Sequence, residues 1–353
     1  ILLFRMGDFY EMFYEDAKTA SRVLGLTLTS RSKGPTAVPL AGIPYHALDT
    51  YLARLIKAGH RVAVCEQVED SSQAKGLIRR EVTRLITPGT LTDEALLEQR
   101  EGCYLAAVYC PSRPADAKAG TGRTVGIAWV ELSSGAFYTM AAPAATMMDE
   151  LVRIAPAEVL IADGGELDTP IFRQNLTQSV SASVTARPPW ALDAHAATKN
   201  LTDHFHSRSL DGFGFDGWDE SVSAAGAVIE YLTETQKTTL SHITQLRRFD
   251  RRDRMVIDGN TLRCLEVHRT LRTNQRSGSL LGCVDRTCTG MGARLLERWL
   301  TFPLTGYSSI LARQDAVEEL TGDRARLGEL RELLQAASQI DRIATAVALG
   351  RVR

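Results

Sequence analysis

The sequence contains no C-x-x-C pair, although six cysteines are spread along its 353 residues. C-x-x-C pairs are typical of zinc ribbons and redox sites. Disulfide scaffolds are typical of small secreted proteins. We therefore expect reduced thiols in a cytosolic protein and no zinc ribbon. A chain of this length also buries a sizeable core without disulfides or metal ions.

Long apolar runs are missing as well, and no uninterrupted stretch is long enough for a transmembrane helix. The chain opens at Ile1 without an initiator methionine and without a basic segment followed by an apolar one. We therefore expect no secretory signal, no membrane partner and a cytoplasmic location, and we expect the chain to be clipped from a longer protein. Its length is typical of two or three domains.

Motifs of nucleotide and metal chemistry are also lacking. No G-x-x-x-x-G-K-[ST] segment occurs, so these residues offer no Walker A cradle for phosphates. Residues 212–217 match G-x-G-x-x-G, but no apolar strand precedes them, and we interpret them as a loop before a helix. His204 and His206 have no third ligand nearby in the sequence, and we place them in a structurally neutral polar loop.

Lysine is absent from residues 241–300, where twelve arginines face six acidic residues for a net charge of +6. Residues 1–100 are nearly neutral, with 13 basic and 12 acidic side chains, and residues 101–240 carry 9 against 17. The change of sign near residue 240 predicts a change of domain there. The arginines either face a partner that carries phosphates or form a solvated helical face, and charge alone leaves both open.

Hydrophobic periodicity predicts a mixed α/β domain over residues 1–98. Helical spacing covers 16–24 and 48–56, and short apolar segments predict strands at 26–29, 61–65 and 80–86. We expect the segment at 39–44, rich in proline and glycine, to be a turn region.

The next region has the order of a ribonuclease-H-like α/β domain, which we place at 101–240. Strands are predicted at 104–110, 124–132 and 136–140, followed by a helix at 147–154 and a strand at 158–162. A metal-dependent nuclease on this fold needs a carboxylate on the first strand with others beside it. That strand has none, and Glu131 on the second strand has no obvious partner, so we expect no catalytic residue and no metal site.

The last region, 241–353, is predicted to be mostly α-helical. A long helix precedes this region, and we expect Asp219 to be its N-cap. Within the region, helical periodicity returns over 261–271, 292–300, 310–320 and 324–349. The pattern still runs at Arg353, so we expect this helical domain to be cut short.

Residues 8–13 crowd three aromatic and two acidic side chains in front of a helix. One interpretation places Phe9 and Phe13, four residues apart, in the core. The other presents Phe9 to a ligand as an apolar wedge with Glu11 as a hydrogen-bonding group. On an extended backbone Phe9 and Glu11 would point to one side and Tyr10 to the other.

The segment Gly7-Asp8-Phe9-Tyr10-Glu11-Met12-Phe13 resembles the opening motif of the MutS family of DNA mismatch-recognition proteins. Cys264 departs from the family, which usually has Asn before Leu-Glu. Further segments similar to the family in order and spacing follow along nearly the whole chain, at 39–46, 64–67, 80–82, 87–90, 212–214, 224–226, 231–237, 258–266, 289–294, 299–304 and 313–314.

The resemblance implies an architecture and a site. The chain would hold the mismatch-binding α/β domain, the ribonuclease-H-like connector and the start of the helical lever or core domain. Phe9 would stack on a mispaired base from the minor groove and Glu11 would hydrogen-bond that base. The residues of the motif that flank this pair are Gly7, Asp8, Tyr10 and Phe13.

The resemblance also implies partners for a full-length protein. These are mismatched double-stranded DNA, a second copy in a homodimer and a MutL-type protein, in a bacterial, nucleoid-associated setting. ATP and Mg would serve an ATPase domain beyond residue 353, and we expect no cofactor in this chain. Two alternatives stay open: a MutS-like scaffold that binds junctions or proteins without reading mismatches, and a metal-dependent nuclease.

We predict that this chain neither hydrolyses nor tightly binds ATP, because it contains no phosphate cradle. The measurement is phosphate release from ATP with and without a chelator of Mg²⁺. Release above a buffer blank that the chelator abolishes would contradict the prediction.

Overall fold

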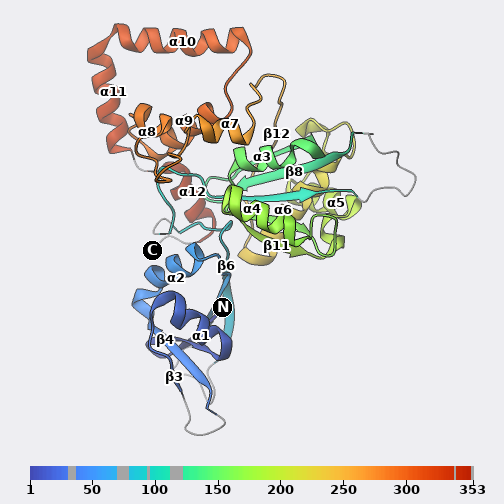
Figure 1. Cartoon of the computed structure of the whole chain (residues 1–353), viewed down its shortest axis with the longest axis vertical. Helices are drawn as coiled ribbons and strands as arrows, with labels where there is room; N and C mark the ends of the chain where they lie inside the picture. Colours follow the sequence, from blue (N-terminus) through green and yellow to red (C-terminus); the bar gives the residue numbers. More distant parts are fainter. Residues whose placement is uncertain (31–36, 70–78, 94–95, 112–121, 338, 351–353) are drawn as a thin grey trace.

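The structure is a computed structural model that describes residues 1–30, 37–69, 79–93, 96–111, 122–337 and 339–350. Three parts follow one another along the chain (Figure 1). One sheet with two helices (blue) lies at one end of the long axis, and a second sheet with its helices (cyan and green) lies in the middle. Helices α10 and α11 (red) extend to the opposite end.

The first sheet is built on one covered face. Its six strands have the order β3-β4-β2-β1-β5-β6. Helices α1 (Tyr14–Leu24) and α2 (Leu48–Lys57) pack apolar residues against it, as their spacing predicts. The strands are β1 (Leu2–Met6), β2 (Phe9–Phe13), β3 (Thr29–Ser30), β4 (Pro39–Pro44), β5 (Val62–Gln67) and β6 (Arg80–Ile86).

Residues 39–44, predicted to be a turn region, form strand β4, and that prediction is wrong. Ala41 and Ile43 are buried, which gives the alternation of a strand with one covered face. Pro39 and Pro44 lie at the two ends of the strand, where a missing N–H donor is tolerated. The strand predicted at 26–29 is also shifted, because only Thr29–Ser30 pairs with β4.

The second sheet has the order β11-β10-β7-β8-β9-β12, and the strands predicted at 104–110, 124–132, 136–140 and 158–162 are confirmed. Strand β12 lies after residue 240 in sequence and pairs in parallel with β9. The strands are β7 (Tyr104–Tyr109), β8 (Thr124–Glu131), β9 (Ala136–Pro143), β10 (Glu158–Ala162), β11 (Ser183–Arg187) and β12 (Leu246–Arg248).

Helix α6 forms the centre of this second part. Asp219 caps it, accepting a hydrogen bond from the backbone N–H of Ser221 at 2.9 Å. The helix lies directly on β8 at Gly126, where an added Cβ would come within 1.8 Å of the Glu220 carbonyl oxygen. The helices are α3 (Met147–Ile154), α4 (Pro170–Val180), α5 (Ala194–His204) and α6 (Glu220–Gln236).

His204, expected in a loop, is the last residue of α5, and its Nε2 lies 2.8 Å from the Ile243 carbonyl oxygen. The ring therefore closes a structural contact between the helix and the segment before β12. Residues 212–217 lie between α5 and α6 with no strand leading into them, as expected, although they begin in a single 3-10 turn, η4 (Asp211–Phe213).

The last part is helical, with two breaks that the periodicity does not predict. The helix expected at 261–271 ends at Cys264, and Glu266 adopts a positive φ of 49° that ends helical geometry. The helix expected at 324–349 is two helices. The elements are α7 (Gly259–Cys264), α8 (Leu280–Val284), α9 (Gly290–Thr301), α10 (Tyr307–Gly322), α11 (Arg324–Ala336) and α12 (Ile340–Ala348).

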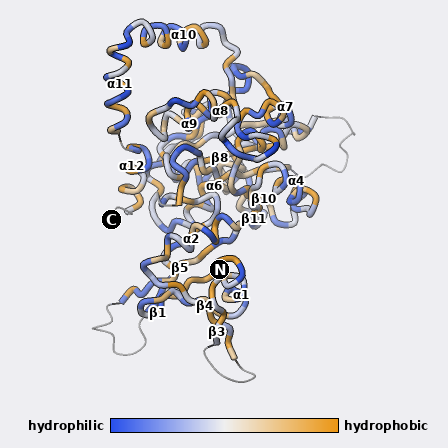
Figure 2. The backbone as a smooth tube through the Cα atoms, turned by 60° about the vertical axis from the view of Figure 1, so that its left-hand side comes forward, coloured by the Kyte–Doolittle hydropathy of each residue, from blue (hydrophilic) through white to orange (hydrophobic). Residues whose placement is uncertain are grey.

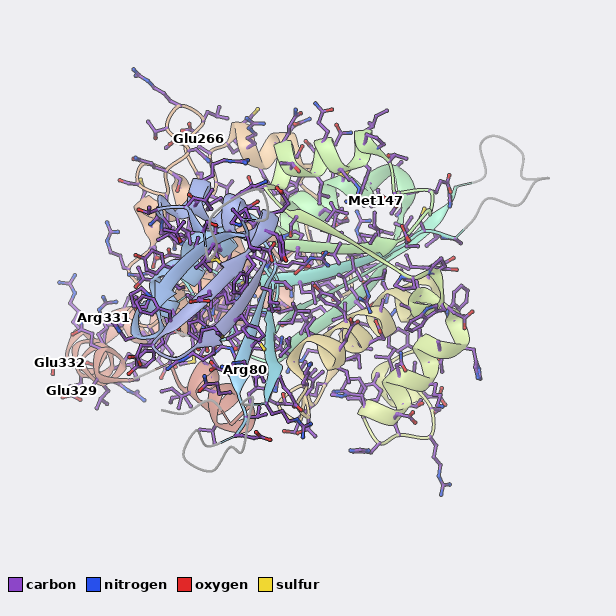
Figure 3. All side chains as sticks on the ribbon, turned by 90° about the horizontal axis from the view of Figure 1, so that it is seen from below. Arg80, Met147, Glu266, Glu329, Arg331 and Glu332 are labelled. Carbon is purple, nitrogen blue, oxygen red and sulfur yellow. The ribbon has the colours of Figure 1, made fainter. Side chains whose placement is uncertain are left out.

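Helices α10 and α11 contain no buried residue. Figure 2 shows hydrophilic and hydrophobic residues interspersed along both. Figure 3 shows Arg331 and Glu332 of α11 at the edge of the molecule. These two helices therefore lack the packed face that stabilises α6.

A buried carboxylate, Glu158 at the start of β10, joins the two sheets. Its Oε2 accepts hydrogen bonds from the Thr87 hydroxyl at 2.5 Å and the Gly89 N–H at 3.1 Å, both in the turn after β6. Its Oε1 accepts from the Thr185 hydroxyl at 2.6 Å and the Tyr231 hydroxyl at 2.8 Å. Four donors satisfy the charge, as a buried carboxylate requires.

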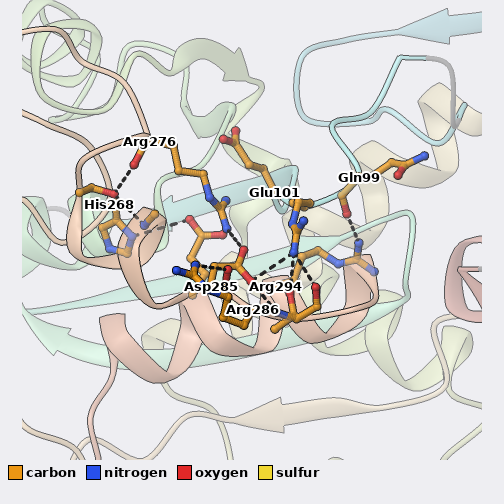
Figure 4. A network of polar contacts seen from close by, with 12 residues as sticks. Gln99, Glu101, His268, Arg276, Asp285, Arg286 and Arg294 are labelled. Atoms are coloured by element: carbon orange, nitrogen blue, oxygen red, sulfur yellow. Dashed lines mark hydrogen bonds and ion pairs between the residues drawn. The ribbon is translucent and has the colours of Figure 1, made fainter. Parts of the chain in front are cut away.

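Arginines of the 241–300 stretch connect the helical part with the segment that follows the first sheet (Figure 4). Arg294 donates to the Gln99 carbonyl oxygen at 2.8 Å and to the Asp341 carboxylate at 2.5 Å. The buried Glu131 lies 3.5 Å from Arg294 and 3.7 Å from Arg342, measured between Oε1 and the nearest guanidinium nitrogen. Glu131 is therefore part of a structural ion cluster.

Other arginines of the same stretch pair with carboxylates of this chain, an arrangement that charge counting does not predict. Guanidinium nitrogens lie within 3.0 Å of carboxylate oxygens in each of these pairs: Arg248–Asp219, Arg251–Glu150, Arg252–Asp250, Arg269–Glu101 and Arg276–Asp285. Several of the pairs connect distant segments.

We predict that Glu158→Gln lowers the free energy of unfolding by about 2–4 kcal/mol. The NH2 group of the glutamine would face two of the four hydrogen-bond donors, and the other two donors would bond a neutral oxygen in place of a charged one. Glu332→Gln, the same change on the exposed α11, is the matched control and should change the value by less than about 0.5 kcal/mol. Chemical denaturation measures both. Equal values for the two variants would show that the Glu158 contacts contribute little.

Candidate functional site

The candidate site lies at the hairpin that joins β1 to β2. Gly7 adopts a positive φ of 59°, which glycine accepts without strain, and with Asp8 it makes the turn. Met6 and Phe9 are register partners at the end of the hairpin. The Tyr45 N–H donates to the Asp8 carbonyl oxygen at 2.9 Å, which fixes the turn against the end of β4.

Side chains alternate along β2 as the sequence predicts for an extended segment. Tyr10 and Met12 are 3% and 0% exposed and face the core, whereas Phe9 is 49% exposed. Glu11 is half-buried and shares the face of Phe9. Phe9 is therefore not a core residue, and Phe13 is half-buried at the end of the strand.

Tyr10 anchors the strand from the opposite face. Its hydroxyl donates to the Glu66 carboxylate on β5, and the Arg5 guanidinium lies 5.3 Å from its ring centre. Burial, with the Glu66 carboxylate adding to it, raises the pKa of Tyr10 to about 12. The phenol thus stays protonated as a hydrogen-bond donor at neutral pH.

Neighbouring strands complete the face that carries Phe9 and Glu11. Phe4 of β1 and Gly42 of β4 are the two register partners of Glu11. The Arg80 guanidinium lies 5.4 Å from the ring centre of Phe4, and its Nε donates to the Arg5 carbonyl oxygen at 2.8 Å. Figure 3 labels Arg80 on β6.

This arrangement presents an aromatic ring and a carboxylate side by side on a sheet surface. The ring offers a stacking surface, and the carboxylate offers hydrogen-bond acceptors. Sequence reasoning identified Phe9 and Glu11 with the flanking Gly7, Asp8, Tyr10 and Phe13, and the structure brings all six together in one hairpin strand and its turn. It missed Gly42 and Arg80, because only strand pairing places them beside this pair.

The described residues contain neither a group of side chains that could hold a metal ion nor a membrane-spanning helix. Within it, no three His, Cys, Asp or Glu side chains are grouped to hold a metal ion. The described helices include none that is both long and apolar enough to cross a membrane.

A cavity of about 1030 Å³ lies between the second sheet and the helices that follow it. Its lining includes Trp129, Tyr138 and Phe249, with Arg269 and Arg276 paired to carboxylates as described above. Sequence reasoning could not find it, because residues from many widely separated segments line it.

Comparisons with known proteins cover nearly the whole chain. The family model of MutS domain I matches residues 1–95, that of MutS domain II residues 103–244, and that of MutS domain III residues 260–353. A DNA mismatch repair protein MutS from Rhodopirellula baltica is 46% identical over 99% of this chain and 40% of its own length.

Proteins of the same name from Myxococcus xanthus and Methanothrix thermoacetophila are each 42% identical over 99% of this chain and 38% of their own length. The chain thus spans about two fifths of the length of these curated relatives. With three successive MutS domains matched and identities above 40%, the chain belongs to the MutS family.

Proposed function

We propose that this chain recognises mispaired or unpaired bases in duplex DNA, as the first step of DNA mismatch repair. The observation that carries the proposal is the half-exposed ring of Phe9, held beside Glu11 on a strand whose alternate side chains are buried. An exposed aromatic ring on so firmly anchored a strand supports contact with a ligand.

The physics of mispairs fits an apolar wedge. A mispair stacks and pairs less well than its neighbours, so kinking the duplex there costs less. Phe9 would enter from the minor groove, stack on the mispaired base and hold the kink open, as apolar side chains do in other minor-groove binders.

Glu11 would hydrogen-bond the same base. Its charge also repels the phosphates of any duplex that offers no such bond, so it would weaken binding to matched DNA more than to a mispair. Mispaired and matched DNA would thus be distinguished by how easily the duplex deforms and by one hydrogen-bond acceptor, the Glu11 carboxylate. No separate contact for each kind of mispair would be needed.

The sheet order supports a ribonuclease-H-like connector. The first strand of the second sheet, β7, lies between β8 and β10, so that a meander of three antiparallel strands is extended by two parallel ones. We place the mismatch-binding domain at 1–98, this connector at 101–240 and the start of the helical lever or core domain at 241–353. Strand β12 (Leu246–Arg248) lies beyond this boundary in sequence and still adds to the connector's sheet.

A full-length protein would add ATP dependence. The relatives are more than twice as long as this chain, so an ATPase that uses ATP and Mg would lie outside these residues. We propose that the chain itself is not an enzyme and binds no cofactor, and that the whole protein works as a homodimer with a MutL-type partner.

Two rival functions remain distinguishable. A MutS-like scaffold that binds junctions or proteins would not need Phe9 and Glu11 for discrimination. A metal-dependent nuclease would need a carboxylate on β7, which has none, and Glu131 on β8 already lies among arginines.

We predict that the isolated chain binds DNA weakly and that its affinity falls steeply with salt. Its first hundred residues are nearly neutral, its connector carries −8, and arginines of the basic stretch pair within the chain. Acidic side chains therefore offset much of the positive charge that could meet phosphates, and contacts between cations and phosphates weaken as salt rises. Titrations at several salt concentrations measure this, and tight binding above physiological salt would contradict it.

We predict that Phe9→Ala, in a full-length MutS protein that contains this chain, lowers mismatch affinity roughly ten- to a hundred-fold, because stacking contributes on the order of 1–3 kcal/mol per base. Affinity for matched duplex should barely change, because an intact stack has no place for the ring. Glu11→Ala should lower the ratio of mismatch to matched affinity while matched binding stays level or rises.

Fluorescence anisotropy with mismatched and matched duplexes, together with melting temperatures, measures these effects. Trp190→Ala, which removes another exposed aromatic ring (59% exposed), is the control and should leave both affinities unchanged. If Phe9→Ala lowers the melting temperature and both affinities in parallel, Phe9 serves folding and the site assignment is wrong.

A further inference from the structure

Gly42 lies in the middle of β4, directly opposite Glu11. An added Cβ at this position would lie 3.9 Å from Cδ1 of Phe9 and 4.0 Å from Cγ of Glu11. Position 42 therefore borders both side chains of the proposed site, and the residue itself is exposed.

The fold alone does not require glycine here. The φ of Gly42 is not among the positive values, so the backbone suits any L-residue. The nearest atom to an added Cβ, the Tyr10 carbonyl oxygen at 3.7 Å, is at ordinary contact distance. Glycine inside a strand even destabilises it, by about 0.5–1 kcal/mol relative to alanine.

Glycine inside a strand usually marks a bulge, a tight bend or the close approach of a ligand. The register between β2 and β4 runs without a shift from Phe9↔Pro44 to Phe13↔Leu40, which excludes a bulge. Buried Ala41 and Ile43 on either side keep the regular alternation of a strand, with no sign of a sharp bend. Close approach of a ligand is the reason that remains.

We propose that Gly42 is a specificity-determining residue, whose missing side chain leaves a hollow between Phe9 and Glu11 for the mispaired nucleotide. This inference rests on the function proposed above. Phe9 and Glu11 are two residues apart, about 7 Å along the strand. A base that stacks on the ring and hydrogen-bonds the carboxylate has to descend between them, over the neighbouring strand at position 42. A side chain there would lift the nucleotide away from both.

The test compares Gly42→Ala and Gly42→Val with Phe9→Ala in a full-length MutS protein that contains this chain. Affinities for a duplex with one mismatch or one unpaired base and for the matched duplex are measured by fluorescence anisotropy, together with melting temperatures. Gly212→Ala is the matched control, because an added Cβ there meets no atom within 4 Å and its φ is not positive.

We expect Gly42→Val to lower mismatch affinity by about 5- to 100-fold, the range expected for crowding a close contact, and Gly42→Ala to lower it less. Matched-duplex affinity should not change, and the melting temperature should stay level or rise. Adding Gly42→Val to Phe9→Ala should cost little more, because both changes remove the same stacked state.

Three outcomes would overturn the inference in different ways. If Gly42→Val keeps the wild-type ratio of mismatch to matched affinity while Phe9→Ala loses it, the hollow is unnecessary and the proposed function stands. If Phe9→Ala also keeps the ratio, the proposed function fails and this inference fails with it. If Gly42→Val lowers the melting temperature and both affinities together, glycine at this position serves folding.

Discussion

A single buried carboxylate, Glu158, fixes how the first sheet meets the second. A charge removed from water has to be satisfied by hydrogen bonds, and its four donors come from the turn after β6, from β11 and from α6. The position of each of these elements is thereby tied to the others. Arg294 adds a second tie by bonding the Gln99 carbonyl oxygen between the sheets. The hairpin that carries Phe9 is held against the rest of the molecule through these contacts.

The sequence predicts elements well where one local signal dominates. The helix at 147–154 and the strand at 158–162 have the predicted bounds, because their apolar periodicity runs without interruption. The strand at 39–44 was missed because its prolines and glycine resemble a turn, and only pairing with β2 shows that they lie where a strand tolerates them. The helix predicted beyond residue 264 fails because Glu266 adopts a left-handed conformation that periodicity does not record.

Part of the candidate site follows from local sequence, and part follows only from the fold. Alternation along one strand is a local property, so the shared face of Phe9 and Glu11 could be predicted from the sequence. Gly42 and Arg80 come from segments about 30 and 70 residues away, and only the sheet order brings them to that face. The charge of the arginine stretch was equally plain in the sequence, yet partners such as Glu101 for Arg269 lie in another part of the chain. Local patterns therefore identify strand β2 as the place of the site, but not the residues that surround it.

The uneven packing of the helices has a consequence for how the molecule opens. Helix α6 buries most of its residues, whereas α10 and α11 bury none. Isolated helices of 16 and 13 residues are only marginally stable in water. In this chain taken by itself, which spans about two fifths of its relatives' length, their amides can therefore exchange with solvent by fraying at a free energy close to zero. Those of α6 exchange only when the second sheet itself unfolds. Within one chain, backbone protection thus ranges from almost none in α10 and α11 to the full stability of the core.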